Sequence, residues 1–414
     1  MHRKFLPAYL LTLVNVMGFS ILMPVLPFVV VEHYGAPKFV YGLLLSTYSF
    51  FQFLGAPYLG KLSDSMGRKP ILIVSQAGTL LCWLIFGLSY FVPNVPIGFM
   101  AAPLFVIFFA RVLDGITGGN TSVAHAYVAD ITTREEKNYI FGYIGGIVGL
   151  GMIVGPAIGG LSASTSWGYL GTVSCCVVLS LITLLLLIFR LEESLPVEKR
   201  KPREKVSILS SFSLVRRIRN LESPKSIRNI FALRLLFNIT MATYVSTIAL
   251  FIIDLFRFNE RELGMFMLVV GVFISFNQAF MSKWFIAKIG TYSTLRLGMF
   301  LSIIGFVSIT LTETLWIYFL LYYTLNLGIA LCAPTLNALI AQKASPKEAG
   351  EVMGISESIG SLSNAIFPLI GAALYGMYDE KLYWGVAVLP FVGLLISMKK
   401  LPEDTQHTDE EPLH

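Results

Sequence analysis

The sequence predicts an all-α membrane protein in which twelve helical spans form two six-helix bundles around a central cavity. Of the 414 residues, 55% are hydrophobic and only 14% are charged, whereas soluble domains carry about 25% charged residues. A membrane helix needs roughly 20 mainly apolar residues, and the chain offers about twelve stretches of that kind. A polar, basic segment divides these stretches into two groups of equal number.

The apolar stretches and the polar segments between them set the expected organisation. In chain order, the predicted spans are 5–31, 41–60, 70–92, 98–125, 139–162, 168–190, 229–253, 262–282, 295–312, 315–341, 351–376 and 383–399. We expect an N-terminal bundle over 1–190, a basic cytoplasmic linker over 191–228, a C-terminal bundle over 229–400 and an acidic, disordered tail over 401–414. Within the linker, residues 206–221 are interpreted either as an amphipathic helix on the inner leaflet or as solvated chain.

The distribution of basic residues predicts the orientation. Of the 31 lysines and arginines, only Lys38, Arg257, Arg261 and Lys381 fall in loops that are external if the N-terminus is inside. Basic residues concentrate in cytoplasmic loops of membrane proteins. We therefore expect a multi-pass protein of the cell (inner) membrane with both termini cytoplasmic. The same placement argues that the net charge of +6 does not serve nucleic-acid binding.

Several function classes find no support in the sequence. It contains no Gly-Lys-Ser/Thr phosphate-binding loop, no His/Cys/Asp cluster with metal-ligand spacing and no soluble catalytic constellation. The cysteines all fall within expected spans, where we interpret them as small packing residues. We therefore predict a protein that is not an enzyme and needs neither a cofactor nor a metal.

The loop after the second span carries the most specific motif. It reads Gly60-Lys-Leu-Ser-Asp64-Ser-Met-Gly67-Arg68-Lys69-Pro70 and resembles the signature G-x-L-x-D-x-x-G-R-[KR] of the major facilitator superfamily. The resemblance implies a gating loop whose charges join an acid at the cytoplasmic end of span 4, where Asp130 stands. A static surface salt bridge is the alternative for Asp130. The loop after span 8 repeats the pattern faintly, with Gly290 opposite Gly67.

Span 5 carries a run of glycines around a proline. It reads Gly151-Met-Ile-Val-Gly155-Pro156-Ala-Ile-Gly159-Gly160, and glycines four apart on one helix face permit close approach of a second helix. The run resembles the antiporter motif G-x-x-x-G-P-x-x-G-G of drug:proton exporters. That resemblance favours export, whereas helix packing alone is the alternative explanation.

Charged residues within spans are costly and usually face a cavity or a partner. In span 4, Arg111 and Asp114 share a helix face. The segment resembles the R-x-x-x-G motif of the same exporters, which implies a link to proton transfer; a neutralised structural pair is the alternative. In span 11, Glu357 is the second candidate for proton coupling, or else a side chain that reaches cytoplasmic water.

Other polar residues within spans are candidates for the substrate cavity, with interhelical hydrogen bonding as the alternative for each. They are Asn15, Gln52, Asn238, Tyr244, Gln278 and Asn326.

Together, the motifs identify the sequence as similar to the twelve-span drug:proton antiporter branch of the superfamily, which includes the tetracycline exporters. The segment from Gly18 to Pro27 also resembles a span 1 motif of that branch, although span 1 lacks an acid. The resemblance implies a monomeric transporter that exports a small drug-like compound or metabolite against protons by alternating access. An uptake permease or uniporter for a sugar, metabolite or siderophore is the first alternative. A non-transporting sensor or scaffold is the second.

Overall fold

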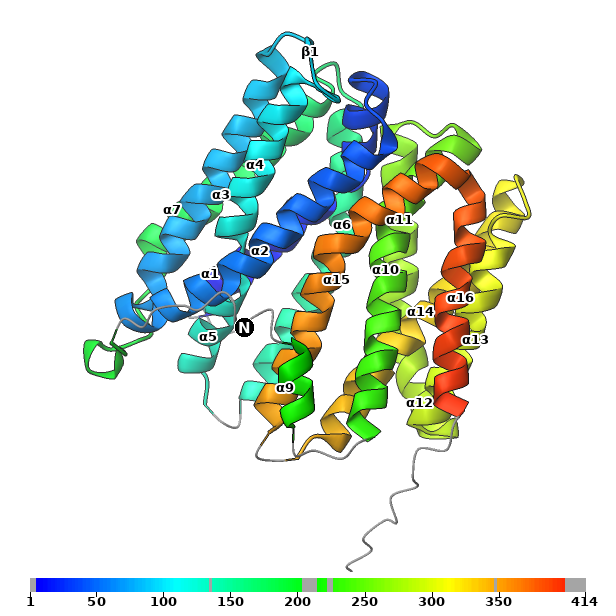
Figure 1. Ribbon diagram of the computed structural model, residues 1–414. Coiled ribbons are helices and arrows are strands. Elements are labelled where there is room, and N and C mark those ends of the chain that lie inside the picture. The colour runs from blue at the N-terminus through cyan, green and yellow to red at the C-terminus, as the bar shows by residue number, and fades with distance from the viewer. Residues whose placement is uncertain (1–4, 134–135, 203–213, 222–225, 346–347, 399–414) are drawn as a thin grey trace, which may run out of the picture.

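The computed structural model describes residues 5–133, 136–202, 214–221, 226–345 and 348–398, and most of these residues are helical (Figure 1). The N-terminal half contains α1 (Leu6–Leu22) with a π-helical continuation (Phe28–His33), α2 (Lys38–Met66), α3 (Arg68–Leu88), α4 (Ala102–Gly118), α5 (Thr121–Asp130), α6 (Lys137–Ala163) and α7 (Tyr169–Arg190). A short antiparallel hairpin, β1 (Pro96–Ile97) with β2 (Met100–Ala101), precedes α4.

The second half begins with a short helix of the linker, α9 (Leu214–Asn220). It continues with α10 (Ser226–Phe256), α11 (Glu260–Phe276), a π-helical segment (Asn277–Met281), α12 (Ser282–Ile289), α13 (Thr291–Ser308), α14 (Leu315–Lys343), α15 (Ala349–Tyr378) and α16 (Leu382–Met398). Single 3-10 turns lie at Ser89–Phe91, Val197–Lys199 and Asp379–Lys381.

The helices account for the predicted membrane crossings. In the described residues, 10 helical stretches are long and apolar enough to cross a membrane. One of them, Ala349–Met398, contains both α15 and α16, and the apolar α1 is shorter. The π-helical segments continue α1 and join α11 to α12, and α4 and α5 together make one crossing. The predicted all-α fold of twelve crossings in two bundles is therefore confirmed, and the chain is a multi-pass membrane protein.

Some predicted boundaries are wrong. Span 4 was expected to begin at residue 98, but residues 96–101 form the β-hairpin because Gly98, at φ +62°, turns the chain between its strands. The same span is interrupted at Gly119 and Asn120 and ends only at Asp130. The exact limits assigned to the bundles and the linker stay predictions.

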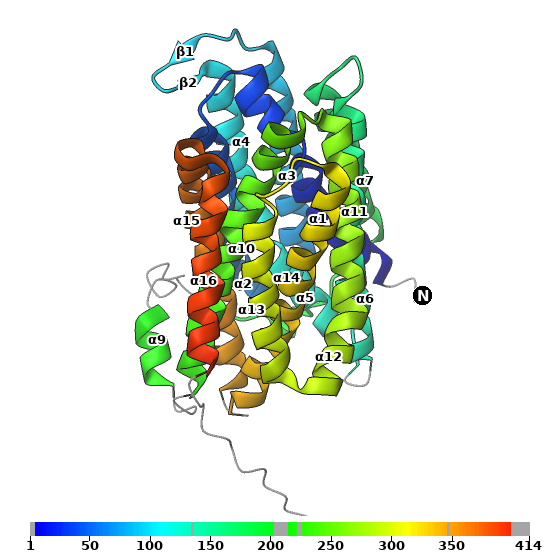
Figure 2. The same ribbon diagram turned by 90° about the vertical axis from the view of Figure 1, so that its right-hand side faces the viewer.

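The two ends of the helices define two faces of the molecule. We call the face with the loops at residues 34–37, 164–168 and 309–314 the outer face, and the face with the loops at 131–133, 290 and 344–345 the inner face. The hairpin lies at the outer face, and α9 and α12 lie at the inner face (Figures 1 and 2). Gly67 and Gly290 lie between α2 and α3 and between α12 and α13, with the same type of backbone conformation at φ +104° and +80°.

The two halves of the chain contact each other along two seams, α2 with α15 and α6 with α11. A Cβ added to Gly42 of α2 would lie 2.6 Å from the Cβ of Ala372, and the Ser46 hydroxyl accepts a hydrogen bond of 2.9 Å from the Leu369 amide. These residues lie in the outer parts of their helices, as do the α6–α11 contacts described below. The halves therefore meet mainly toward the outer face.

The linker helix packs on protein. Residues 206–213 lie outside the described residues, but Leu214 and Leu221 are buried in a cluster with apolar residues of α10 and α15. Arg217 pairs with Glu351 of α15, with 3.5 Å between Nε and Oε1. Protein therefore covers Leu214 and Leu221 in this part of the linker, while the interpretation as a helix on the inner leaflet stays a prediction. The predicted acidic tail over 401–414 lies outside the described residues.

Candidate functional site

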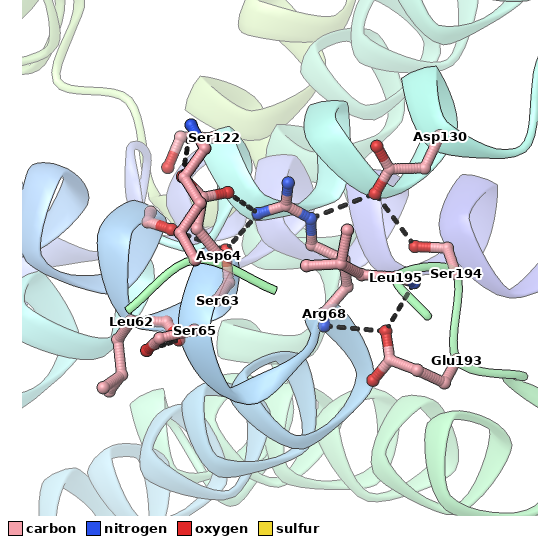
Figure 3. A network of polar contacts seen from close by, with 12 residues as sticks. Leu62, Ser63, Asp64, Ser65, Arg68, Ser122, Asp130, Glu193, Ser194 and Leu195 are labelled. Carbon is pink, nitrogen blue, oxygen red and sulfur yellow. Dashed lines mark hydrogen bonds and ion pairs between the residues drawn. The ribbon is translucent and has the colours of Figure 1, made fainter. Parts of the chain in front are cut away.

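Arg68 is the centre of a charge cluster on the inner face, where α2, α3 and α5 end or begin (Figure 3). Its Nη1 lies 2.6 Å from Asp64 Oδ1 and donates to the Ser63 hydroxyl at 2.6 Å, while its Nε lies 3.1 Å from Asp130 Oδ2. Gly67 allows this arrangement because its φ of +104° reverses the chain between α2 and α3. The structure thus brings together three charges that were predicted as one gating network.

The cluster includes a residue that sequence reasoning missed. Glu193, just after α7, accepts hydrogen bonds from the backbone amides of Arg68 at 2.8 Å and Lys69 at 3.2 Å. A carboxylate at a helix N-terminus satisfies free amides and complements the helix dipole. The adjacent Ser194 donates to Asp130 Oδ2 at 3.1 Å. The start of the linker is therefore attached directly to the charge cluster.

Two other members of the predicted loop contribute differently. The Lys69 side chain forms no ion pair within the described parts of the chain, so its amide rather than its charge joins the cluster. A Cβ added to Gly60 would make only an ordinary contact, 3.8 Å from the Ser122 hydroxyl. Neither position therefore shows the tight geometry of Gly67.

The glycines of α6 allow close packing on two different helices. A Cβ at Gly151 would lie 3.0 Å from Val16 of α1. At Gly155 and Gly159 it would overlap Ser20 and the Ile21 carbonyl oxygen, respectively. Ser20 also donates a 2.9 Å hydrogen bond to the Gly151 carbonyl. Three glycines of the motif therefore hold α1 against α6.

The last glycine of the motif faces the other half of the chain. A Cβ at Gly160 would overlap the Glu260 carbonyl oxygen and lie 3.0 Å from Gly264 Cα, both in α11. A Cβ at Gly264 would in turn lie 2.6 Å from the Pro156 carbonyl oxygen. The α6 motif is thus part of the seam between the two halves.

Arg111 and Asp114 form a buried ion pair in α4. Arg111 Nη1 lies 3.2 Å from Asp114 Oδ2, and only 4% and 6% of the two residues are exposed. The guanidinium carbon lies 5.1 Å from the centre of the Trp83 ring and 5.8 Å from that of Tyr48. Cation–π contacts of this kind stabilise a cation away from water. Among the described residues, Asp114 is thus the one carboxylate paired with Arg111, and aromatic rings surround the guanidinium group.

A cavity of about 560 Å³ lies between the two halves. It is lined by α1 to α6, by α10, α11, α14 and α15, and by the π-helical segment Asn277–Met281. Its predicted lining residues Asn15, Gln52, Asn238 and Gln278 all reach it, and so does Asp114, whereas Arg111 does not. The sequence reasoning missed Asn364, Tyr48 and Trp83, which also line it. The cavity therefore presents one carboxylate among amides and aromatic rings.

Two of its amides also stabilise the interruption between α4 and α5. Asn15 donates to Asn120 Oδ1 at 2.8 Å, and Gln52 donates to the Gly118 carbonyl at 3.1 Å. These bonds satisfy polar groups at a helix interruption, where backbone groups lose their usual partners. The cavity wall and the shape of α4 therefore depend on the same residues.

Two predicted cavity residues do not line it. Tyr244 is buried and hydrogen-bonded to the Tyr322 hydroxyl, and Asn326 accepts a 3.3 Å hydrogen bond from Asn277. Both side chains point into the packing of the second half. The prediction was wrong because both spans carry polar residues on several faces, and the sequence does not reveal which face is turned to the cavity.

Glu357, the second candidate for proton coupling, lies outside the cavity. It is exposed, and it interacts electrostatically with Arg234 of α10 and His125 of α5. Its exposure agrees with the alternative of a side chain that reaches water, and the nearby cation was not foreseen. The cation was missed because Arg234 is more than a hundred residues away in the sequence.

The fold and the site define a membrane transporter with a cavity shared by two helical bundles. The sequence profile of the Major Facilitator Superfamily matches residues 8–368, and the chain belongs to this superfamily. It is 30% identical to the class G tetracycline resistance protein of Vibrio anguillarum, over 91% of each chain. It is 29% identical to the class C tetracycline resistance protein of Escherichia coli, over 87% of each chain.

Solved structures show the same fold. The human organic anion transporter MFSD10 matches with a TM-score of 0.69 at 22% identity, over 95% of this chain and 99% of that one. A bacterial homologue of the human lysosomal transporter Spinster, in an inward-facing and unoccupied conformation, matches with a TM-score of 0.75 at 13% identity, over 95% of each chain. At these identities the likeness extends to the fold alone.

Proposed function

We propose that this transporter exports a small organic compound in exchange for protons. The observation that carries the proposal is the position of Asp114 in the wall of the shared cavity, with Arg111 behind it and outside the cavity. A proton and a substrate that enter the cavity both reach this carboxylate. Binding of one then alters binding of the other, which is the requirement for coupled exchange.

The direction of transport is inferred from α6 and from the relatives. The α6 glycines pack against α1 on one side and α11 on the other. The antiporter motif therefore connects α1 of the first bundle to α11 of the second. Two of the proteins named above are tetracycline resistance proteins, and we extend export of a drug-like compound to this chain on that basis. We further propose an inner-membrane monomer whose inner face, with both termini, is cytoplasmic.

The charge cluster on the inner face is proposed to act as a latch. Asp64, Arg68 and Asp130 join the ends of three helices through bonds that lie at the edge of the membrane. The Arg68 side chain is 10% exposed, but Asp64 and Asp130 are 33% and 26% exposed, and ion pairs with such partly exposed partners are weak enough to break and reform. Because Glu193 and Ser194 bind Arg68 and Asp130, the start of the linker would move each time the latch opens or closes.

The experiment begins with a growth screen of a pump-deficient bacterial host that expresses the protein, using a panel that contains tetracycline. A compound whose inhibitory concentration rises is then tested for accumulation in inverted membrane vesicles with an imposed proton gradient. We expect accumulation that stops when the gradient is collapsed and is lost in Asp114→Asn. Accumulation that persists without any gradient, or a host made more sensitive by uptake, would contradict the proposal.

A further inference from the structure

An ion cluster joins the two halves at the outer face. Lys38 is the first residue of α2. Its Nζ lies 2.8 Å from Asp254 Oδ2 near the end of α10, and 3.4 Å from Asp379 Oδ1 between α15 and α16. One lysine of the first half is therefore paired with two carboxylates of the second.

An aromatic residue of α15 completes the cluster. The Tyr375 hydroxyl donates a 2.8 Å hydrogen bond to Asp254 Oδ2, the same oxygen that contacts Lys38. The Lys38 ammonium also lies 4.5 Å from the centre of the Tyr375 ring. Charge-assisted hydrogen bonds and cation–π contacts both strengthen when water is partly excluded. The Asp254 side chain is 41% exposed and that of Asp379 is 65% exposed, so the pair with Asp254 is the more protected one.

The cluster lies at the outer end of the α2–α15 seam. Gly42, one turn along α2 from Lys38, approaches Ala372 closely, and Gly376 of α15 lies next to Lys38, where an added Cβ would be 3.6 Å from Lys38 Cβ. The ion pairs therefore continue a tightly packed interface up to its edge. When the outer ends of the two halves separate, Lys38 moves with α2 and both carboxylates remain with the second half.

We propose that Lys38, Asp254 and Tyr375 form an outer latch that holds the outer seam closed, and that its bonds break each time the outer face opens. The inference rests on the proposed alternating access. These are positioning residues, because they contact neither the cavity nor any other proposed transport group. The outer latch has the same construction as the inner cluster around Arg68, with one cation held by two carboxylates from different elements. The two clusters would oppose one another across the membrane.

The test measures how often the outer seam opens, using a reporter cysteine. Ser46→Cys is nearly isosteric and places a thiol in the α2–α15 seam, where Ser46 is 5% exposed. The four native cysteines are first replaced in the full-length protein. Right-side-out membrane vesicles are then treated with a charged, membrane-impermeant methanethiosulfonate. When closing is fast, the rate of modification is proportional to the open population.

We expect Lys38→Gln and Asp254→Asn each to raise the modification rate about fivefold, the upper range for a partly exposed ion pair. The double variant should react no faster than the faster single variant, because both changes remove the same contact. Lys381→Gln is the matched control, since Lys381 is exposed at the same face and forms no ion pair with any residue that the structure describes. Its rate should equal that of the parent.

An unchanged rate in both Lys38→Gln and Asp254→Asn would overturn the outer latch. So would an equal acceleration by Lys381→Gln, which would indicate a general effect of surface charge. A double variant whose acceleration is the product of the two single effects would show that the residues act independently, and would also overturn it. The readout does not depend on protons or on an exported compound, so loss of proton coupling in the vesicle assay would contradict the proposed function while leaving this result valid.

Discussion

Replacing Gly159 of α6 by alanine should destabilise the protein, because the added methyl group has no room. Its Cβ would overlap the Ile21 carbonyl oxygen and lie 3.0 Å from the carbonyl carbon. These are backbone atoms of α1, which cannot rotate away as a side chain can. The substitution must therefore move one helix relative to the other, and α1 also contributes residues to the cavity wall.

Helix α6 also contains a glycine, Gly145, where an added methyl group would contact no other residue. A Cβ at Gly145 would have no neighbour within 4 Å. Alanine in place of glycine in a helix stabilises it by about 0.5–1 kcal/mol, whereas overpacking costs about 1–3 kcal/mol. Relative to Gly145→Ala, we therefore expect Gly159→Ala to lower the free energy of unfolding by about 2 kcal/mol.

The assay heats both variants and the parent in the same detergent and measures the fraction that remains monodisperse by size-exclusion chromatography. Gly145→Ala should lose its monodisperse peak at or above the temperature of the parent, and Gly159→Ala several degrees below it. If Gly159→Ala is as heat-resistant as Gly145→Ala, close packing against α1 is not the reason for glycine at this position.

Three further outcomes follow from the site. Asp64→Asn should leave insertion and monodispersity unchanged but reduce flux about tenfold or more, because a charged hydrogen bond to Arg68 is lost; normal flux in vesicles would contradict the latch. Gly155→Leu should abolish coupled export or make the vesicles leak protons, since the side chain would displace Ser20; wild-type accumulation with a stable gradient would refute this. Asp114→Asn should abolish proton release when substrate is added to solubilised protein, while Glu357→Gln keeps it; the reverse result would assign the proton to Glu357.

Features that depend on neighbouring residues could be predicted from the sequence. The inner loop is encoded within a few residues, so the charges of Asp64 and Arg68 and the turn at Gly67 were predicted together and are found together. Helical spans follow from continuous apolar length, which is a local property too. The fold class was therefore predictable, and so was the glycine face of α6.

Features that depend on the packing of distant helices could not be predicted. Glu193 reaches Arg68 across 125 residues, and Lys38 reaches Asp254 across 216. Neither acid stands in a motif, and each is one of several acids near the end of a helix. The side of a span that faces the cavity was equally hidden, which is why both Asn238 and Tyr244 were named although only Asn238 lines the cavity. In α10 the polar residues are spread over several helix faces, so no single polar stripe marks that side.

The positions of Arg111 and Asp114 bear on which acid carries the proton. Asp114 reaches the cavity and is 6% exposed, whereas Glu357 is exposed near the inner face and lies outside the cavity. A proton carrier in alternating access must be reachable from one side at a time, and a group that stays in water on one side does not meet that requirement. Arg111 keeps aromatic contacts that do not depend on the charge of Asp114, so the cation remains stabilised when the carboxylate is protonated. The geometry therefore favours Asp114 over Glu357 as the proton carrier, and it does so more strongly than the sequence alone.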